Sequence, residues 1–142
     1  MDKPKLFTMG YQGHKPADML ALVERMNAIV LDIRYSASSP NPSFTLTGFR
    51  TLLGSRYELC KDFGNVNYRG DGPIVLVDYT HGIRRVMEIA AKHPGKPLIL
   101  MCGCHSPANC HRSVVARFLT DDGFSVSEVT WDKPQPSLFG GG

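Results

Sequence analysis

The run Pro97-Leu98-Ile99-Leu100-Met101 is the most hydrophobic strand-like stretch of the chain, and Cys102-Gly103-Cys104-His105-Ser106-Pro107-Ala108-Asn109-Cys110-His111-Arg112 follows it directly. A short apolar run bounded by turn residues is typical of a buried strand. Asn109 is suited to cap a helix, and apolar residues at helical spacing continue to residue 119. This stretch therefore predicts a buried strand, a loop and a helix, in that order.

The same alternation extends over the rest of the chain. Strands are expected at residues 6–9, 28–33, 57–60, 97–101 and 124–129, and helices at 15–26, 47–53, 75–92 and, after Asn109, up to 119. The almost uninterrupted apolar character of residues 28–33 is typical of a strand that is covered on both faces. Alternating strands and helices predict an α/β fold, a single layered domain with a mostly parallel sheet flanked by helices.

Length and composition indicate one globular domain. The 142 residues are 42% hydrophobic and 20% charged, which is ordinary for a soluble domain with one core. We expect this domain to span residues 1–132 and a flexible tail with two prolines and a terminal glycine triplet to span 133–142. Asp32 interrupts the best apolar run and no signal-peptide core is visible, so a cytoplasmic protein without membrane partners is expected.

Charge and cysteine content narrow the possible functions. A formal net charge of +3 is too small to imply nucleic-acid binding by itself. Three of the four cysteines fall within nine residues, and a reducing cytoplasm disfavours disulfides. Free thiols or metal ligands are therefore expected.

Reactive and charged side chains follow several of the predicted strands. They are Tyr11, Asp32, Arg34 and Cys102, with Cys110, His111 and Arg112 expected in the first turn of the helix after the fourth strand. Because ligands of open parallel sheets bind beyond the carboxyl ends of the strands, we expect these side chains to meet at one edge. The positive end of the helix dipole would favour an anion there.

Three interpretations of this edge stay open. In an enzyme, Cys102 or Cys110 would be the nucleophile, His111 or Asp32 the base, and Arg112 and Arg34 the anion clamp beside Tyr11. In a metal site, the ligands would be Cys102, Cys104, Cys110 and either His105 or His111 around zinc, although no cofactor is the first expectation. In a purely structural reading, the cysteines are small buried hydrophobes and Arg112 forms an ion pair, for which Asp32 is the candidate partner.

A set of short motifs resembles the bacterial and phage-associated family called Domain of Unknown Function 488. The motifs are Thr8-Met9-Gly10-Tyr11, Asp32-Ile33-Arg34, Ser39-Pro40-Asn41-Pro42-Ser43-Phe44, Phe63-Gly64-Asn65 and Cys110-His111-Arg112. The resemblance runs from about Leu6 to Trp131. The resemblance implies a small α/β domain with a cleft but no particular reaction. Members of that family commonly carry an acid where this chain has Cys104, so proton chemistry by that acid would here be lost or taken over by a thiol or by His105.

The tail carries a second resemblance. Gln135-Pro136-Ser137-Leu138-Phe139 is similar to the pentapeptide by which bacterial replication and repair proteins bind the sliding clamp, apart from Pro136 at the second position. Leu138 and Phe139 would fill an apolar pocket and Gln135 would supply a directional hydrogen bond. The alternative is that this apolar pair folds back on its own domain.

These observations favour two functions. The first is an enzyme acting on a phosphate-bearing nucleotide or nucleic-acid substrate, linked to DNA replication or repair through the tail. The second is a non-catalytic module that binds an anionic small molecule or nucleic acid at the same edge, with zinc as an optional stabilising ion.

Overall fold

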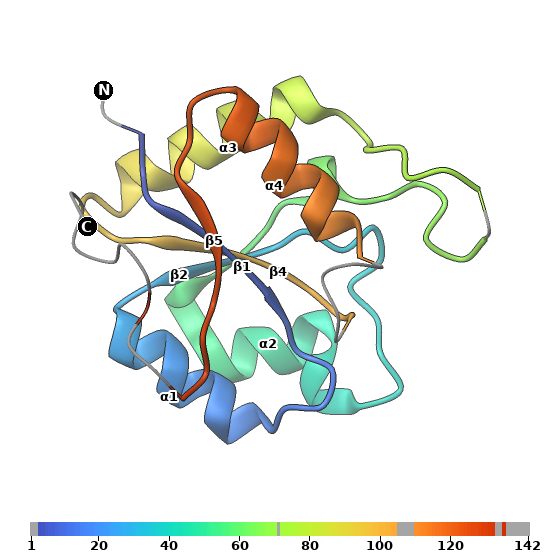
Figure 1. Cartoon of the computed structure of the whole chain (residues 1–142). Helices are drawn as coiled ribbons and strands as arrows, with labels where there is room; N and C mark the ends of the chain where they lie inside the picture. Colours follow the sequence, from blue (N-terminus) through green and yellow to red (C-terminus); the bar gives the residue numbers. More distant parts are fainter. Residues whose placement is uncertain (1–2, 71, 105–109, 133–134, 136–142) are drawn as a thin grey trace.

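The five predicted strands form one sheet, in which every pair of neighbouring strands is parallel and the order is β3-β2-β4-β1-β5 (Figure 1). The strands are β1 (Leu6–Gly10), β2 (Ile29–Asp32), β3 (Tyr57–Leu59), β4 (Leu98–Cys102) and β5 (Val126–Glu128). This computed structural model describes residues 3–70, 72–104, 110–132 and 135. The predicted α/β class and parallel sheet are confirmed.

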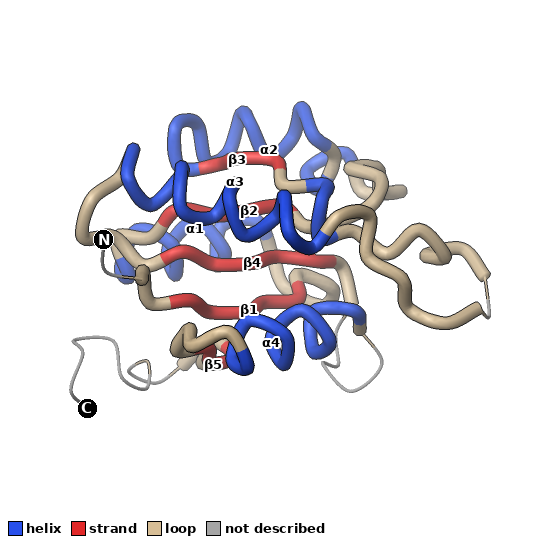
Figure 2. Tube along the Cα trace, turned by 90° about the horizontal axis from the view of Figure 1, so that it is seen from above, coloured by secondary structure: helices blue, strands red, loops and turns tan. Residues whose placement is uncertain are grey.

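Helices cover both faces of the sheet. They are α1 (Pro16–Met26), α2 (Leu46–Leu53), α3 (Tyr79–Lys92) and α4 (His111–Asp121), with short 3₁₀ turns at Pro42–Phe44, Gly54–Arg56 and Lys61–Phe63. Figure 1 shows α1 and α2 on one face and α3 and α4 on the other, and Figure 2 shows the strands side by side. Two separate cores result, one on each face.

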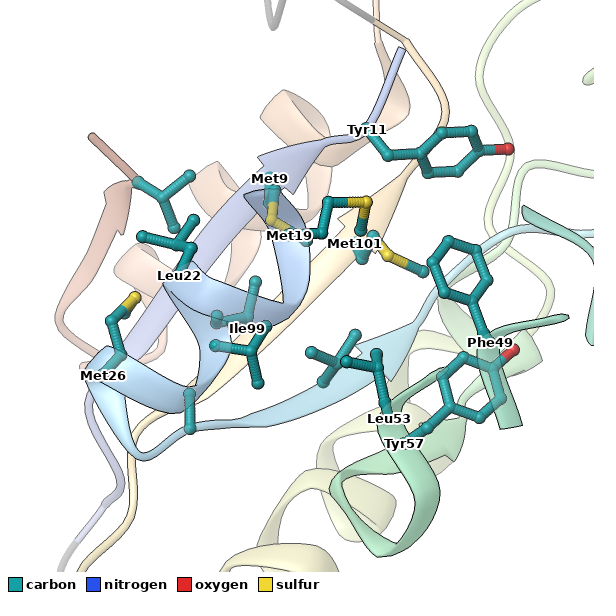
Figure 3. Close-up of a cluster of buried hydrophobic side chains, with 14 of the residues drawn as sticks. Met9, Tyr11, Met19, Leu22, Met26, Phe49, Leu53, Tyr57, Ile99 and Met101 are labelled. Atoms are coloured by element: carbon teal, nitrogen blue, oxygen red, sulfur yellow. The ribbon is translucent and has the colours of Figure 1, made fainter. Parts of the chain in front are cut away.

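The pleat of β4 explains how one strand serves both cores. Ile99 and Met101 face α1 and α2, where they meet Met19 and Phe49 in the cluster of Figure 3. The alternate residues of β4 belong to the other cluster, together with residues of α3 and α4. Since successive side chains of a strand point to opposite faces, an apolar residue at every position of β4 is what burial on both faces requires.

Helix α3 begins later than the sequence pattern predicts. The Asp78 side chain accepts a hydrogen bond from the His81 backbone N–H at 3.0 Å and so caps a helix that starts at Tyr79. Val75 and Val77, which were expected in the helix, lie before this cap and are 45% and 41% exposed. The predicted start of this helix at residue 75 was therefore wrong, because the capping aspartate was overlooked.

Gln135 lies inside the segment predicted to be a flexible tail, and it is bound to the domain. Its side-chain oxygen accepts a hydrogen bond from the Thr130 N–H at 2.7 Å, and its amide nitrogen donates to the Thr130 carbonyl. Residue 135 is 9% exposed. This one position of the tail thus extends the ordered contacts beyond β5.

Among the helices in the described part of the chain, none combines the length and the apolar character needed to cross a membrane.

Candidate functional site

The polar side chains predicted to meet at the carboxyl edge of the sheet lie in two groups on opposite faces. Asp32 is in register with Met101, which belongs to the core beneath α1 and α2. Cys102, one residue further along β4, belongs to the core beneath α3 and α4. The pleat therefore separates Asp32 from Cys102 although their strands are neighbours. The prediction of one joint site was wrong in this respect.

Asp32 is the centre of the first group, which we call the Asp32 network (Tyr11, Asp32, Arg34 and Tyr57). Arg34 Nε donates to Asp32 Oδ1 at 2.8 Å and its Nη2 donates to Oδ2 at 2.6 Å. The Tyr57 hydroxyl donates to the same carboxylate at 2.5 Å. Asp32 is 0% and Arg34 7% exposed. This is a buried ion pair with a two-point contact, the strongest geometry for an arginine and a carboxylate.

The remaining donors of Arg34 also have partners within the protein. Its Nη1 donates to the Tyr11 hydroxyl at 3.0 Å and to the Phe44 carbonyl at 2.6 Å. Arg34 thereby ties the loop that leads into Phe44 to the sheet edge. The predicted roles of Asp32 as a base and of Arg34 as an anion clamp are not supported by this geometry, because each is already satisfied by the other.

The second group, the thiol–imidazole cluster, consists of Cys102, Cys104, Cys110 and His111. One ligand-type atom from each of Cys102, Cys110 and His111 lies within 4.8 Å of the others. Cys104 is held next to this trio, because its carbonyl accepts a hydrogen bond from Arg112 Nη1, which also donates to Cys102 Sγ. All four cysteines of the chain are free thiols, as expected. The end of β4 and the start of α4 thus bring these side chains close together.

The local chain path explains this gathering. Cys102 is the last residue of β4, and Cys110 is the N-cap of α4, so the end of the strand and the start of the helix place the two thiols close together. Cys102 and Cys110 are each 1% exposed, whereas Cys104 is partly exposed. The predicted nucleophiles Cys102 and Cys110 are thus the two inaccessible thiols, and Cys104 is the accessible one.

His111 is oriented by a backbone carbonyl. Its Nε2 lies 3.0 Å from the Ile33 carbonyl oxygen, and its Nδ1 lies 3.9 Å from Cys110 Sγ. A carbonyl oxygen only accepts, so Nε2 must carry a proton. In the neutral imidazole, the lone pair then sits on Nδ1 and faces the thiols.

Arg112 is fully buried, and its partner is Glu128 rather than Asp32. Its Nε and Nη2 donate to the two carboxylate oxygens of Glu128 at 3.1 and 2.8 Å. Its Nη1 donates to the Cys104 carbonyl at 2.7 Å and to Cys102 Sγ at 3.3 Å. Burial alone would lower the pKa of Arg112, but the bonds to Glu128 and Cys102 raise it. The predicted pairing with Asp32 was wrong, and the guanidinium is not available as a free anion clamp.

Interactions among the thiols shift their pKa values in opposite directions. The pKa of Cys102 is raised by its interactions with Cys104 and Cys110 and by its burial. The pKa of Cys104 is lowered by its interactions with Cys102 and Cys110 and by the charge of Arg112. Cys60, buried elsewhere, has its pKa raised to about 12 mainly by desolvation. The directions of these shifts favour the thiolate form at Cys104, the partly exposed sulfur of the cluster.

A pocket of about 340 Å³ opens at the same edge of the sheet. It is lined by Tyr11, Gln12, Gly13, Ser39, Pro40, Asn41, Phe44 and Gly103. Gly103 separates Cys102 from Cys104 in sequence, and a side chain on Gly103 would come within 3.0 Å of the Tyr11 hydroxyl. Gly103 therefore lines the pocket, lies next to Tyr11 of the Asp32 network, and is adjacent in sequence to two cysteines of the thiol–imidazole cluster.

Sequence reasoning overlooked Glu128 and Tyr57. Glu128 is the only acid in a strand of valine and serine, and its carboxylate also accepts a bond from the Thr8 hydroxyl at 2.6 Å. Tyr57 is the first residue of β3 and is in register with Val30, which lies two residues before Asp32 on β2. A lone acid or hydroxyl inside a strand is the signal that could have identified both, because a buried arginine and a buried aspartate each require a partner.

Other predicted residues lie outside the part of the chain that the structure describes. These are His105, the alternative metal ligand, and Leu138 and Phe139 of the tail. No family model matches the chain, and no curated protein matches it either. The resemblance to Domain of Unknown Function 488 therefore stays a prediction.

Proposed function

We propose that the protein is an enzyme that acts on a phosphate-bearing nucleotide or nucleic-acid substrate at the carboxyl edge of its sheet. The observation that carries this proposal is that the thiol–imidazole cluster adjoins the 340 Å³ pocket through Gly103. Cys104, whose thiol is partly exposed, directly follows the pocket-lining residue Gly103 in sequence. A substrate in the pocket would therefore lie near this thiol.

The composition of the pocket suits a flat polar heterocycle. Tyr11 and Phe44, whose rings lie 4.5 Å apart, contribute aromatic surface. Gln12 and Asn41 contribute amides, the groups that pair with the edges of bases. Helix α4 begins at His111 at the same edge, so the positive end of its dipole favours a nearby phosphate. With both arginines paired internally, this dipole replaces the predicted guanidinium clamp.

The proposed chemistry is nucleophilic catalysis by Cys104. Its sulfur would form a bond to the electrophilic atom of the substrate while the bond to the leaving group breaks. The leaving group would keep the electron pair and take a proton from water. A water molecule would then hydrolyse the sulfur adduct and restore the thiol. No other partly exposed cysteine exists in the chain.

Cys104→Ser is expected to reduce turnover at least about a hundredfold, because a hydroxyl is a much weaker nucleophile than a thiolate. The measurement is product formation from panels of nucleotides and short DNA duplexes and single strands, followed by mass spectrometry. Cys60→Ala is the matched control, since Cys60 shares the same core but its thiol is not grouped with those of Cys102 and Cys110 and the ring of His111. Its turnover should equal that of the wild type.

Binding without consumption of any member of these panels would show the alternative, a non-catalytic binding module. The enzyme proposal would also be wrong if Cys104→Ser and wild type turned over a substrate at the same rate. Mass spectrometry of the quenched reaction adds an independent check, because a covalent intermediate must appear on the peptide that carries Cys104.

The tail supplies a separate proposal, binding to the DNA sliding clamp. We expect the double change Leu138→Ala with Phe139→Ala to abolish clamp binding in a pull-down or by surface plasmon resonance, because the apolar contact is lost. Gln135 must release the Thr130 backbone before it can bind a clamp, so its two hydrogen bonds oppose docking. Unchanged clamp binding by the double variant would contradict the proposal.

A further inference from the structure

We infer that Cys102, Cys110 and His111 form a zinc site, with Cys104 beside it as the fourth ligand. The inference goes beyond the proposed function and does not depend on it, because zinc binding can be measured with the metal alone.

Spacing is the first argument. The donor atoms of Cys102, Cys110 and His111 all lie within 4.8 Å of one another. Around a tetrahedral zinc with bonds of about 2.0–2.3 Å, ligand atoms are roughly 3.5 Å apart. Movements of the side-chain donor atoms by about 1 Å would therefore bring the three of them to the spacing that zinc requires. The three residues come from the end of β4 and the start of α4, so two elements fix their positions.

The orientation of His111 is the second argument. A zinc-binding histidine usually donates its other ring N–H to a carboxylate or a backbone carbonyl, which fixes the tautomer. His111 has this arrangement, since its Nε2 is 3.0 Å from the Ile33 carbonyl while its Nδ1 is on the side of Cys110. A histidine that served only for packing would need no such alignment toward sulfur.

Charge balance is the third argument. Arg112 stands next to the cluster, but Glu128 binds its Nε and Nη2 and neutralises it. Two thiolates and a neutral imidazole balance the charge of a zinc ion, and the third thiolate, Cys104, adds one negative charge at a partly exposed ligand. The buried part of the site is therefore uncharged, and the remaining charge lies where solvent reaches it.

Cys104 occupies the place of a fourth ligand. Its backbone carbonyl accepts a hydrogen bond from Arg112 Nη1, which also donates to Cys102 Sγ, and its thiol is partly exposed whereas those of Cys102 and Cys110 are buried. Cys102 and Cys110 are buried and His111 and Cys104 are partly exposed, so the set offers three thiols and one imidazole, a combination that zinc takes in proteins.

The experiment measures zinc binding by the full chain under reducing conditions. We expect one zinc per chain after dialysis, by mass spectrometry of the metal, and retention of zinc against a competing chromophoric chelator. Cobalt should give visible absorption of tetrahedral geometry with a thiolate charge-transfer band. X-ray absorption on the zinc form should find sulfur at about 2.3 Å and nitrogen at about 2.0 Å.

Variants assign the ligands. Cys102→Ser, Cys110→Ser and His111→Gln should each weaken zinc binding at least about tenfold. Cys60→Ala should bind like the wild type, since Cys60 is buried outside the cluster. Cys104→Ser should still bind zinc, and its cobalt charge-transfer band should lose the share of one thiolate.

Each outcome decides the inference without reference to catalysis. Folded wild type, verified by circular dichroism, that binds no stoichiometric zinc or cobalt would overturn it, even if a variant failed to fold. A cobalt spectrum without thiolate bands, or equal zinc binding by wild type and a folded Cys110→Ser variant, would also overturn it. Zinc binding without turnover would support the zinc site and refute the proposed enzyme. Turnover without zinc binding would support the enzyme and refute the zinc site.

Discussion

Asp32→Ala is expected to lower the free energy of unfolding by about 3–5 kcal/mol. Asp32 is 0% exposed and accepts three short bonds from Arg34 Nε, Arg34 Nη2 and the Tyr57 hydroxyl. Its removal leaves the buried Arg34 charge without a counter-ion, which is the costly way to break a buried pair. Urea unfolding followed by circular dichroism measures the change.

Two comparisons separate this effect from the loss of an ordinary acid. Asp62→Ala removes a carboxylate whose partner His81 is 56% exposed, so a loss below about 1 kcal/mol is expected. The double change Asp32→Leu with Arg34→Met should cost less than Asp32→Ala alone, because no charge is left stranded. A loss from Asp32→Ala no larger than that from Asp62→Ala would show that the network does not stabilise the fold.

The fold was predictable because each strand carries its own signal. Residues 28–33 and 97–101 are apolar at nearly every position, and only a strand covered on both faces requires this. Helix-period segments between such strands then leave the layered α/β arrangement as the natural solution. The late start of α3 was missed because Asp78, the residue that caps it, resembles any other loop acid in sequence.

The geometry of the site was only partly predictable, because it depends on strand register. Sequence places Asp32 and Cys102 at the ends of two strands, and both prove to lie at the same sheet edge. Whether they share a face depends on which residues are opposite each other. Asp32 is opposite Met101, and this one-residue offset sends Asp32 and Cys102 to different cores.

The partner of Arg112 was unpredictable for a related reason. Glu128 lies 16 residues after Arg112 on the strand that follows α4, and it reaches the arginine because β5 pairs with β1 rather than with β3. Strand order is a property of the whole chain and leaves little trace in a single segment. A buried arginine nevertheless requires an acidic partner, and Arg112 is 0% exposed.

Gly10→Ala is expected to destabilise the fold by about 3 kcal/mol and to disturb the thiol–imidazole cluster. Gly10 is opposite Cys102 in the sheet, and a side-chain carbon on it would overlap the Cys104 carbonyl oxygen and come within 2.6 Å of Arg112 Nη1. The overlap is with backbone, so no rotamer change relieves it and the chain must move. Zinc affinity should fall in the same variant, because Cys104 is displaced.

Gly70→Ala provides the matched control for this prediction. The same methyl group on Gly70 would meet only the Gly72 nitrogen, at an ordinary 3.9 Å. Its effect on unfolding should stay within about 0.5 kcal/mol, as for most surface changes. If Gly10→Ala proved as harmless as Gly70→Ala, the close approach of Arg112 and the Cys104 carbonyl to β1 would be incorrect. The alignment of thiols that depends on that approach would then lose its support.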